Sequence, residues 1–159
     1  MPLSLIAAVS HNGCIGKTGG IPWHIPGEQL LFKQYTMGNV VLMGRKTWDS
    51  IPERFRPLTG RTNVVISRQH AATLPTGVEH FADITTALKA HKQDNVFIIG
   101  GAEIYRQTID LADTLYITHV PRVIDGDTFF PTIDPAIWEQ VENIPYENFS
   151  FATYRRRTK

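Results

Sequence analysis

The sequence has little cysteine, little net charge and few acidic residues near its N-terminus. Cys14 is the only cysteine among 159 residues, so the chain can form neither an internal disulfide nor a metal site of several thiolates. This usage fits a reducing compartment, and we expect the cytoplasm. The histidines show no metal-ligand spacing, so we expect no bound metal.

The charge balance excludes two classes of partner. The formal net charge is +1, so the chain as a whole attracts neither nucleic acid nor an acidic membrane. The apolar run at residues 3–9 is too short to span a bilayer and lacks the basic segment of a signal peptide. We therefore expect a buried strand there, and no membrane partner.

The pattern of apolar residues predicts an α/β fold. With 42% hydrophobic and 19% charged residues, the chain has the composition of one globular domain, residues 1–159. Runs rich in β-branched residues predict strands at 3–9, 40–43, 63–67, 96–99 and 114–120. Helical spacing predicts helices at 26–35, 46–51, 83–91 and 103–109. Because the strands are apolar on both faces, we expect a largely parallel sheet covered by helices, with an antiparallel ending after residue 128.

Glu28 is the only acidic residue among the first 48. If a helix begins at Pro26, Glu28 shares one helical face with Leu31, Phe32 and Tyr35. No Lys or Arg lies within four residues of it, so a buried Glu28 needs a distant partner or a ligand that donates N–H groups. The plainer interpretation is a solvated carboxylate that complements the helix dipole.

Three segments follow one design, in which an apolar strand leads into a small or basic turn. They are Gly44-Arg45-Lys46-Thr47, Ser67-Arg68 and Gly100-Gly101-Ala102-Glu103. Glycine allows close backbone approach, and cations with helix N-termini bind phosphate. Each segment alone fits an ordinary turn or helix start, but the three together favour a nucleotide. In the second of these segments, Arg68 stands where NAD would need an acidic residue to bind its ribose 2′-hydroxyl. A cation at this place favours the 2′-phosphate of NADP.

An ordered set of fragments extends this pattern nearly from end to end. It includes Ile15-Gly16, Pro22-Trp23, Met43-Gly44-Arg45, Gly60-Arg61, Ile99-Gly100-Gly101 and Gly126-Asp127-Thr128. In order and spacing the set resembles dihydrofolate reductase of the bacterial chromosomal type.

The resemblance implies a fold and a reaction. We expect an eight-stranded, mainly parallel mixed sheet with an antiparallel C-terminal strand and four flanking helices, and an adenosine-binding part at roughly residues 39–90. The implied reaction is reduction of 7,8-dihydrofolate to tetrahydrofolate, with NADPH giving a hydride to C6 while N5 gains a proton. Antifolate inhibitors would also bind, and the chain would be a monomer.

The resemblance also implies roles on the substrate side. Glu28 would accept bonds from the pterin N3–H and 2-amino groups, Trp23 would hold a water, and Thr118 would bond Glu28; these three are the candidate catalytic residues. Arg61 would bind the glutamate α-carboxylate of the substrate. The other substrate-binding candidates are Ile6, Gln29, Phe32, Ile51, Arg56 and Leu58.

On the cofactor side, the resemblance places candidates along the whole of NADPH. They are Ala8, Ile15, Gly16, Gly20, Gly44, Arg45, Lys46, Thr47, Ser67, Arg68, Ile99, Gly100, Gly101, Ala102, Glu103, Ile104 and Tyr105. Arg45, Ser67 and Arg68 would bind the 2′-phosphate. Residues 11–21 would form a mobile lid, and the Gly100–Gly101 peptide would be cis.

Several positions differ from the commonest bacterial pattern. Glu28 stands in place of Asp and Gln29 in place of an apolar residue, while residues 52–55 lengthen a loop so that Arg54 or Arg56 could share the role of Arg61. Residues 27–32 are similar to the transferable, trimethoprim-insensitive enzymes, which suggests trimethoprim resistance as a hypothesis. Two alternatives stay open: a pyrimidine reductase of riboflavin synthesis with a similar fold, and a non-catalytic nucleotide-binding module.

Overall fold

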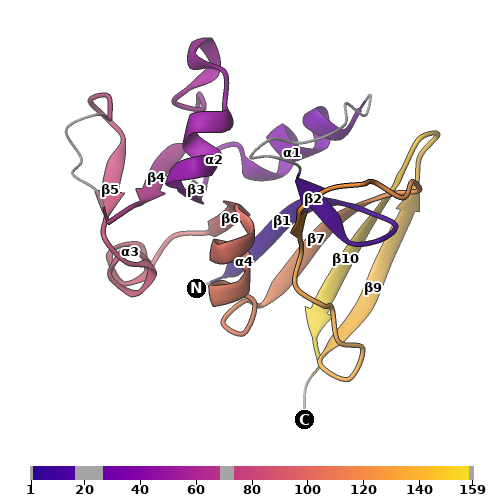
Figure 1. Ribbon diagram of the computed structural model, residues 1–159. Coiled ribbons are helices and arrows are strands. Elements are labelled where there is room, and N and C mark those ends of the chain that lie inside the picture. Colours follow the sequence, from indigo (N-terminus) through magenta and orange to yellow (C-terminus); the bar gives the residue numbers. More distant parts are fainter. Residues whose placement is uncertain (1, 17–26, 69–73, 158–159) are drawn as a thin grey trace.

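The computed structural model describes residues 2–16, 27–68 and 74–157, which form a mixed α/β domain around one large sheet (Figure 1). The strands are β1 (Leu3–Ser10), β2 (Cys14–Gly16), β3 (Val40–Gly44), β4 (Thr62–Ile66), β5 (Glu79–Phe81), β6 (Val96–Gly100), β7 (Thr114–Val120), β8 (Thr128–Phe129), β9 (Trp138–Pro145) and β10 (Ser150–Arg156). The helices are α1 (Glu28–Thr36), α2 (Arg45–Ser50), α3 (Ile84–Ala90) and α4 (Ala102–Thr108), with a 3-10 turn η1 (Glu53–Phe55).

The large sheet has eight strands in the order β5-β4-β3-β6-β1-β7-β10-β9. Every pairing from β5 across to β7 is parallel, whereas β10 runs antiparallel to both β7 and β9. In Figure 1, the hairpin of β9 and β10 stands at one end of the sheet and β5 at the other. The predicted parallel sheet with an antiparallel ending is confirmed.

Helices cover both faces of this sheet, because neighbouring residues of each strand point to opposite sides. Leu5 and Leu42 pack on one face with residues of α3 and α4. Ile6 and Val41 pack on the other face with Trp48 of α2 and with Phe32 of α1. Apolar side chains on both faces explain why the strands read as continuous hydrophobic runs in the sequence.

Local signals set the helix boundaries, and one prediction needs correction. Helix α3 begins where expected, because the side chain of Asp83 accepts a hydrogen bond of 2.7 Å from the Thr86 N–H. Helix α1 begins at Glu28, two residues later than the predicted start at Pro26, because Gly27 takes a left-handed conformation with φ 91°. Pro26 itself lies outside the described residues.

Two short strands were missing from the sequence-based prediction. β5 has three residues at the edge of the large sheet, and β2 pairs with β8 in a small separate sheet. Neither segment is long enough to show a period of two, so the pattern of apolar residues cannot reveal it. None of the described helices is both long and apolar enough to cross a membrane.

The order of the strands creates a crevice between β1 and β6. The chain leaves β1 through α1 to reach β3 on one side, and leaves β6 through α4 to reach β7 on the other. In an open α/β sheet, ligands bind beyond the carboxyl ends of the strands at such a reversal of direction. The fold therefore points to this crevice as the site.

Candidate active site

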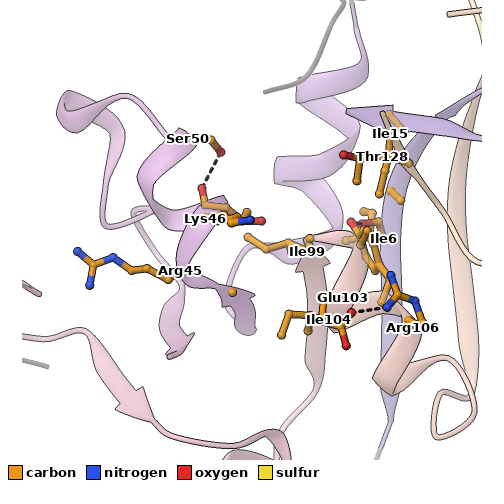
Figure 2. A pocket seen from close by; sticks show the side chains of 18 of the residues that line it. Ile6, Ile15, Arg45, Lys46, Ser50, Ile99, Glu103, Ile104, Arg106 and Thr128 are labelled. Atoms are coloured by element: carbon orange, nitrogen blue, oxygen red, sulfur yellow. Dashed lines mark hydrogen bonds and ion pairs between the residues drawn. The ribbon is translucent and has the colours of Figure 1, made fainter. Parts of the chain in front are cut away.

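A cavity of about 770 Å³ occupies this crevice. Sixteen of the predicted site residues line it: Ile6, Ala8, Ile15, Glu28, Phe32, Gly44, Arg45, Lys46, Thr47, Ile99, Gly100, Gly101, Ala102, Glu103, Ile104 and Tyr105. They come from β1, β2, β3, β6, α1, α2 and α4, so residues far apart in the sequence meet here. Figure 2 shows three of the apolar lining residues, Ile6, Ile15 and Ile99.

Glu28 of α1 lines the cavity, as do Ile6 of β1 and Phe32, one helical turn further along α1. Glu28 is half-buried, so its charge is partly removed from water. Burial raises the pKa of Tyr105, and the charge of Glu28 raises that pKa further. The Tyr105 hydroxyl therefore stays protonated, and it donates a hydrogen bond of 2.7 Å to the Ile6 carbonyl oxygen.

Two glycine turns, Gly44 and Gly100–Gly101, also line the cavity, and together they are called the glycine cradle below. Gly100 has φ 132°, and a Cβ atom at this position would lie 3.0 Å from Thr47 Oγ1. A Cβ atom on Gly44 would lie 3.1 Å from Ile104. Both glycines thus pack too closely on their neighbours to accept a side chain, and Lys46 and Thr47 add a cation and a hydroxyl to the lining of the same cavity. These residues fit NADPH, and the Gly100–Gly101 peptide is cis, as predicted.

Nine predicted site residues in the described part of the chain lie outside the cavity lining. They are Gly16, Gln29, Ile51, Arg56, Leu58, Arg61, Ser67, Arg68 and Thr118. Ile51 and Leu58 pack with Phe32 against one buried cluster, whereas Gln29 is exposed. Thr118 is buried on β7, in register with Ala8 of β1. Trp23, Gly20 and residues 17–21 of the expected lid lie outside the described residues.

The three arginines considered for the glutamate tail have different surroundings. Arg56 donates to the Trp48 carbonyl oxygen at 3.0 Å and lies 3.8 Å from Asp49. Arg54 is exposed, over the ring of Phe55. Arg61 is half-buried and donates to neutral oxygens, the Thr36 hydroxyl at 3.1 Å and the Thr59 carbonyl at 3.0 Å. Burial lowers the pKa of Arg61, because the charged form is partly desolvated.

Six further residues also line the cavity, although the sequence did not predict them as site residues: Ala7, Ser50, Ile66, Arg106, Asp127 and Thr128. Arg106 follows Glu103 by three residues on α4, and Figure 2 shows their ion pair. That spacing predicts an ion pair on α4, but it gives no sign that Arg106 lines the cavity. Asp127 and Thr128 reach the site because β8 pairs with β2, and no local pattern indicates this pairing.

The fold and the site together define a nucleotide-dependent oxidoreductase of the α/β class. The family model for dihydrofolate reductase matches residues 2–156. The chain belongs to the dihydrofolate reductase family. It is an NADPH-dependent oxidoreductase that reduces 7,8-dihydrofolate, and the two alternatives left open by the sequence are set aside.

Individual proteins similar to the chain are named dihydrofolate reductase as well. Dihydrofolate reductase of Neisseria meningitidis serogroup A is 46% identical over 143 residues, which cover 89% of this chain and 86% of the relative. Dihydrofolate reductase type 3 of Salmonella typhimurium is 41% identical over 143 residues, covering 89% and 86%. A solved structure, dihydrofolate reductase from Enterococcus faecalis complexed with NADP(H) and RAB-propyl, superposes with a TM-score of 0.89 at 31% identity, covering 99% of this chain and 97% of that one.

Proposed function

We propose that the pterin ring of dihydrofolate binds at the Glu28 end of the cavity and NADPH at the end formed by Gly44, Gly100 and Gly101. The observation that carries this assignment is that Glu28 and the glycine cradle line one continuous cavity. A substrate held by Glu28 and a cofactor held by the cradle would meet between Ile6 and Ile99.

Each residue at the pterin end has a physical task. The carboxylate of Glu28 accepts two N–H groups of the pterin, which supplies the donors that a half-buried anion requires. Ile6 and Phe32 cover the faces of the ring and exclude water. NADPH, when bound, supplies the hydride. The roles of Trp23 and Thr118 in proton delivery and in orienting Glu28 stay part of the proposal.

Arg61 is the residue we assign to the glutamate α-carboxylate. A guanidinium has five N–H donors, and those of Arg61 reach only neutral oxygens among the described residues. An anionic ligand would therefore offset the desolvation of this half-buried cation. Arg56 is already engaged by Trp48 and Asp49, which favours Arg61 over Arg56.

For the adenosine end, we assign residues 39–90 and place the 2′-phosphate near Arg45, Ser67 and Arg68. Figure 2 shows the Arg45 side chain directed away from Ile6 and Ile15. Ser67 and Arg68 directly follow β4, which pairs with β3 so that Ile66 lies beside Gly44. Arg45, Ser67 and Arg68 thus follow the carboxyl ends of two neighbouring parallel strands.

We also propose a monomer that works in the cytoplasm, binds antifolates and is insensitive to trimethoprim. Cys14 is buried and, as the chain's single cysteine, forms no internal disulfide, which suits a reducing compartment. Relatives named dihydrofolate reductase type 3 and type 6 are 41% and 38% identical to the chain, and residues 27–32 differ from the chromosomal pattern. An inhibition curve as tight as that of a sensitive chromosomal enzyme would contradict the insensitivity.

The substitution Glu28→Gln tests the central assignment. The amide keeps the size of the side chain but loses the negative charge, so one of its two acceptor positions becomes a donor. We expect kcat/KM for dihydrofolate to fall by at least roughly tenfold at neutral pH, because a charge-assisted pair of hydrogen bonds is lost. The KM for NADPH should not change. Loss of NADPH absorbance reports both quantities.

Glu28→Asp is the matched control, since it keeps the charge on a shorter side chain. It should retain more of kcat/KM than Glu28→Gln. Full activity in Glu28→Gln would leave the family reaction in place but remove the proposed role of the carboxylate.

A further inference from the structure

The edge strand β5 is held by few contacts of its own. It has three residues and pairs on one side only, with Val64 beside Glu79 and Ile66 beside Phe81. A strand this short at the edge of a sheet gains little from its own ladder of hydrogen bonds. Contacts of its side chains with other elements therefore decide how firmly it is held.

β5 in turn holds the backbone of Ser67. The Ser67 N–H donates a hydrogen bond of 3.0 Å to the Phe81 carbonyl oxygen. The Nε2 atom of His80 lies 2.7 Å from the Ser67 carbonyl oxygen, which can only accept, so this nitrogen carries the proton. Both backbone groups of Ser67 are thus fixed by β5, and they set the direction in which the chain continues to Arg68.

His91 connects β5 to the end of α3. Its Nε2 atom lies 2.7 Å from Glu79 Oε1 on β5, and its Nδ1 atom lies 2.8 Å from Asp94 Oδ2 in the following turn. Ionised carboxylates only accept hydrogen bonds, so both ring nitrogens can donate to them at once only when the ring is protonated to the imidazolium. The side chain is 11% exposed, and its ring meets the edge of Phe81 with centroids 6.4 Å apart.

The surroundings of His91 are consistent with a charged ring. Burial by itself lowers its pKa, but hydrogen bonds with Asp94 and Glu79 and the charges of these two groups outweigh burial, so the pKa is raised. The backbone N–H of His91 donates to the carbonyl oxygens of Ala87 and Leu88. The residue therefore stands at the C-terminal end of α3, where a positive charge is favoured.

We infer that His91 is a positioning residue for the 2′-phosphate end of the cofactor site: its imidazolium holds Glu79, and thereby β5 and the backbone of Ser67, in place. The inference rests on the proposed assignment of Ser67 and Arg68 to the 2′-phosphate. It predicts that His91 affects the preference for NADPH over NADH without touching either cofactor.

The test uses His91→Phe and Glu79→Ala in the full-length enzyme. His91→Phe keeps an aromatic ring against Phe81 but removes both hydrogen bonds, and Glu79→Ala removes only the connection to β5. For both variants, we expect KM for NADPH to rise by roughly threefold to tenfold, the range for residues that act on a site through an intervening element. KM for NADH, KM for dihydrofolate and kcat should stay unchanged.

Asp94→Ala is the matched control, because Asp94 also bonds His91 but does not belong to β5. It should leave KM for NADPH within roughly twofold of the parent. An equal rise in Asp94→Ala and Glu79→Ala would mean general loosening of this region and would overturn the inference. The Glu79 side chain is 43% exposed and the His91 side chain 11%, so Glu79→Ala disturbs the packing less and keeps the test decisive even if His91→Phe folds poorly.

Arg68→Ala separates this inference from the assignment on which it rests. Suppose that Arg68→Ala raises KM for NADPH but not for NADH, while His91→Phe and Glu79→Ala change neither KM. The phosphate assignment then stands and the proposed role of His91 is wrong. If Arg68→Ala has no effect on the preference, both the assignment and the inference fail. A rise in KM for NADPH but not for NADH in all three variants supports both the assignment and the inference.

Discussion

At the scale of single residues, the two glycines after β6 have different requirements. Gly100 has φ 132°, and its Cβ atom would press on Thr47 Oγ1 at 3.0 Å, whereas a Cβ atom on Gly101 would meet the same oxygen at 3.4 Å. We expect Gly100→Ala to lower the free energy of unfolding by about 1–3 kcal/mol, because a side chain is strained at that φ. Gly101→Ala should cost clearly less. Thermal unfolding of both variants without cofactor measures the difference, and equal losses would contradict it.

The sequence reveals single residues well where their chemistry is unusual for their surroundings. Glu28 stood out because the first part of the chain contains no other acid, and the structure places it in the cavity. Arg61 and Arg56 could not be ranked in the same way. Their difference lies in Asp49 and in the Trp48 carbonyl, and only the folded chain brings these groups next to Arg56.

At the scale of elements, the connection between β5 and α3 should depend on pH. The pKa of His91 is raised in the folded chain, so its contribution to stability is complete below the unfolded value of about 6.5 and is lost as pH rises through the folded value. The difference in Tm between the parent and His91→Phe should therefore be largest near about pH 6 and shrink toward about pH 9.

The size of this effect should be modest. The side chains of Glu79 and Asp94 are 43% and 51% exposed, so solvent screens their attraction to the ring. Added salt should reduce the difference in Tm further at low pH. A difference that grows with pH would show that His91 is neutral in the folded chain.

Elements were predictable in proportion to their burial. β1, β3, β6 and β7 lie near the middle of the sheet, and their buried apolar runs placed them within about two residues of their observed bounds. β9 carries no hydrophobic pattern, because its edge position leaves most of its residues exposed and so allows polar side chains. β5 went unseen because its three residues are too few to show a pattern, and the contacts that fix Ser67 went unseen with it.

At the scale of the whole molecule, the sheet joins both ends of the site into one structure. β1 contributes to the proposed pterin end and pairs directly with β6, whose last residue, Gly100, belongs to the proposed cofactor end. The assigned adenosine-binding part, residues 39–90, shares this sheet through the pairing of β3 with β6. Such a part cannot lose its structure without exposing the apolar faces of its neighbours.

NADPH should therefore stabilise the entire chain in a single transition. At free NADPH about 100 times its Kd, binding adds about 2.7 kcal/mol to the free energy of unfolding, which raises Tm by several degrees for a chain of this size. Trp48 and Trp138 are buried in different clusters, on opposite faces of the sheet. Tryptophan fluorescence and far-ultraviolet circular dichroism should thus give one Tm, shifted equally by NADPH. Two separate transitions, of which NADPH moves only one, would mean that the adenosine-binding part unfolds on its own.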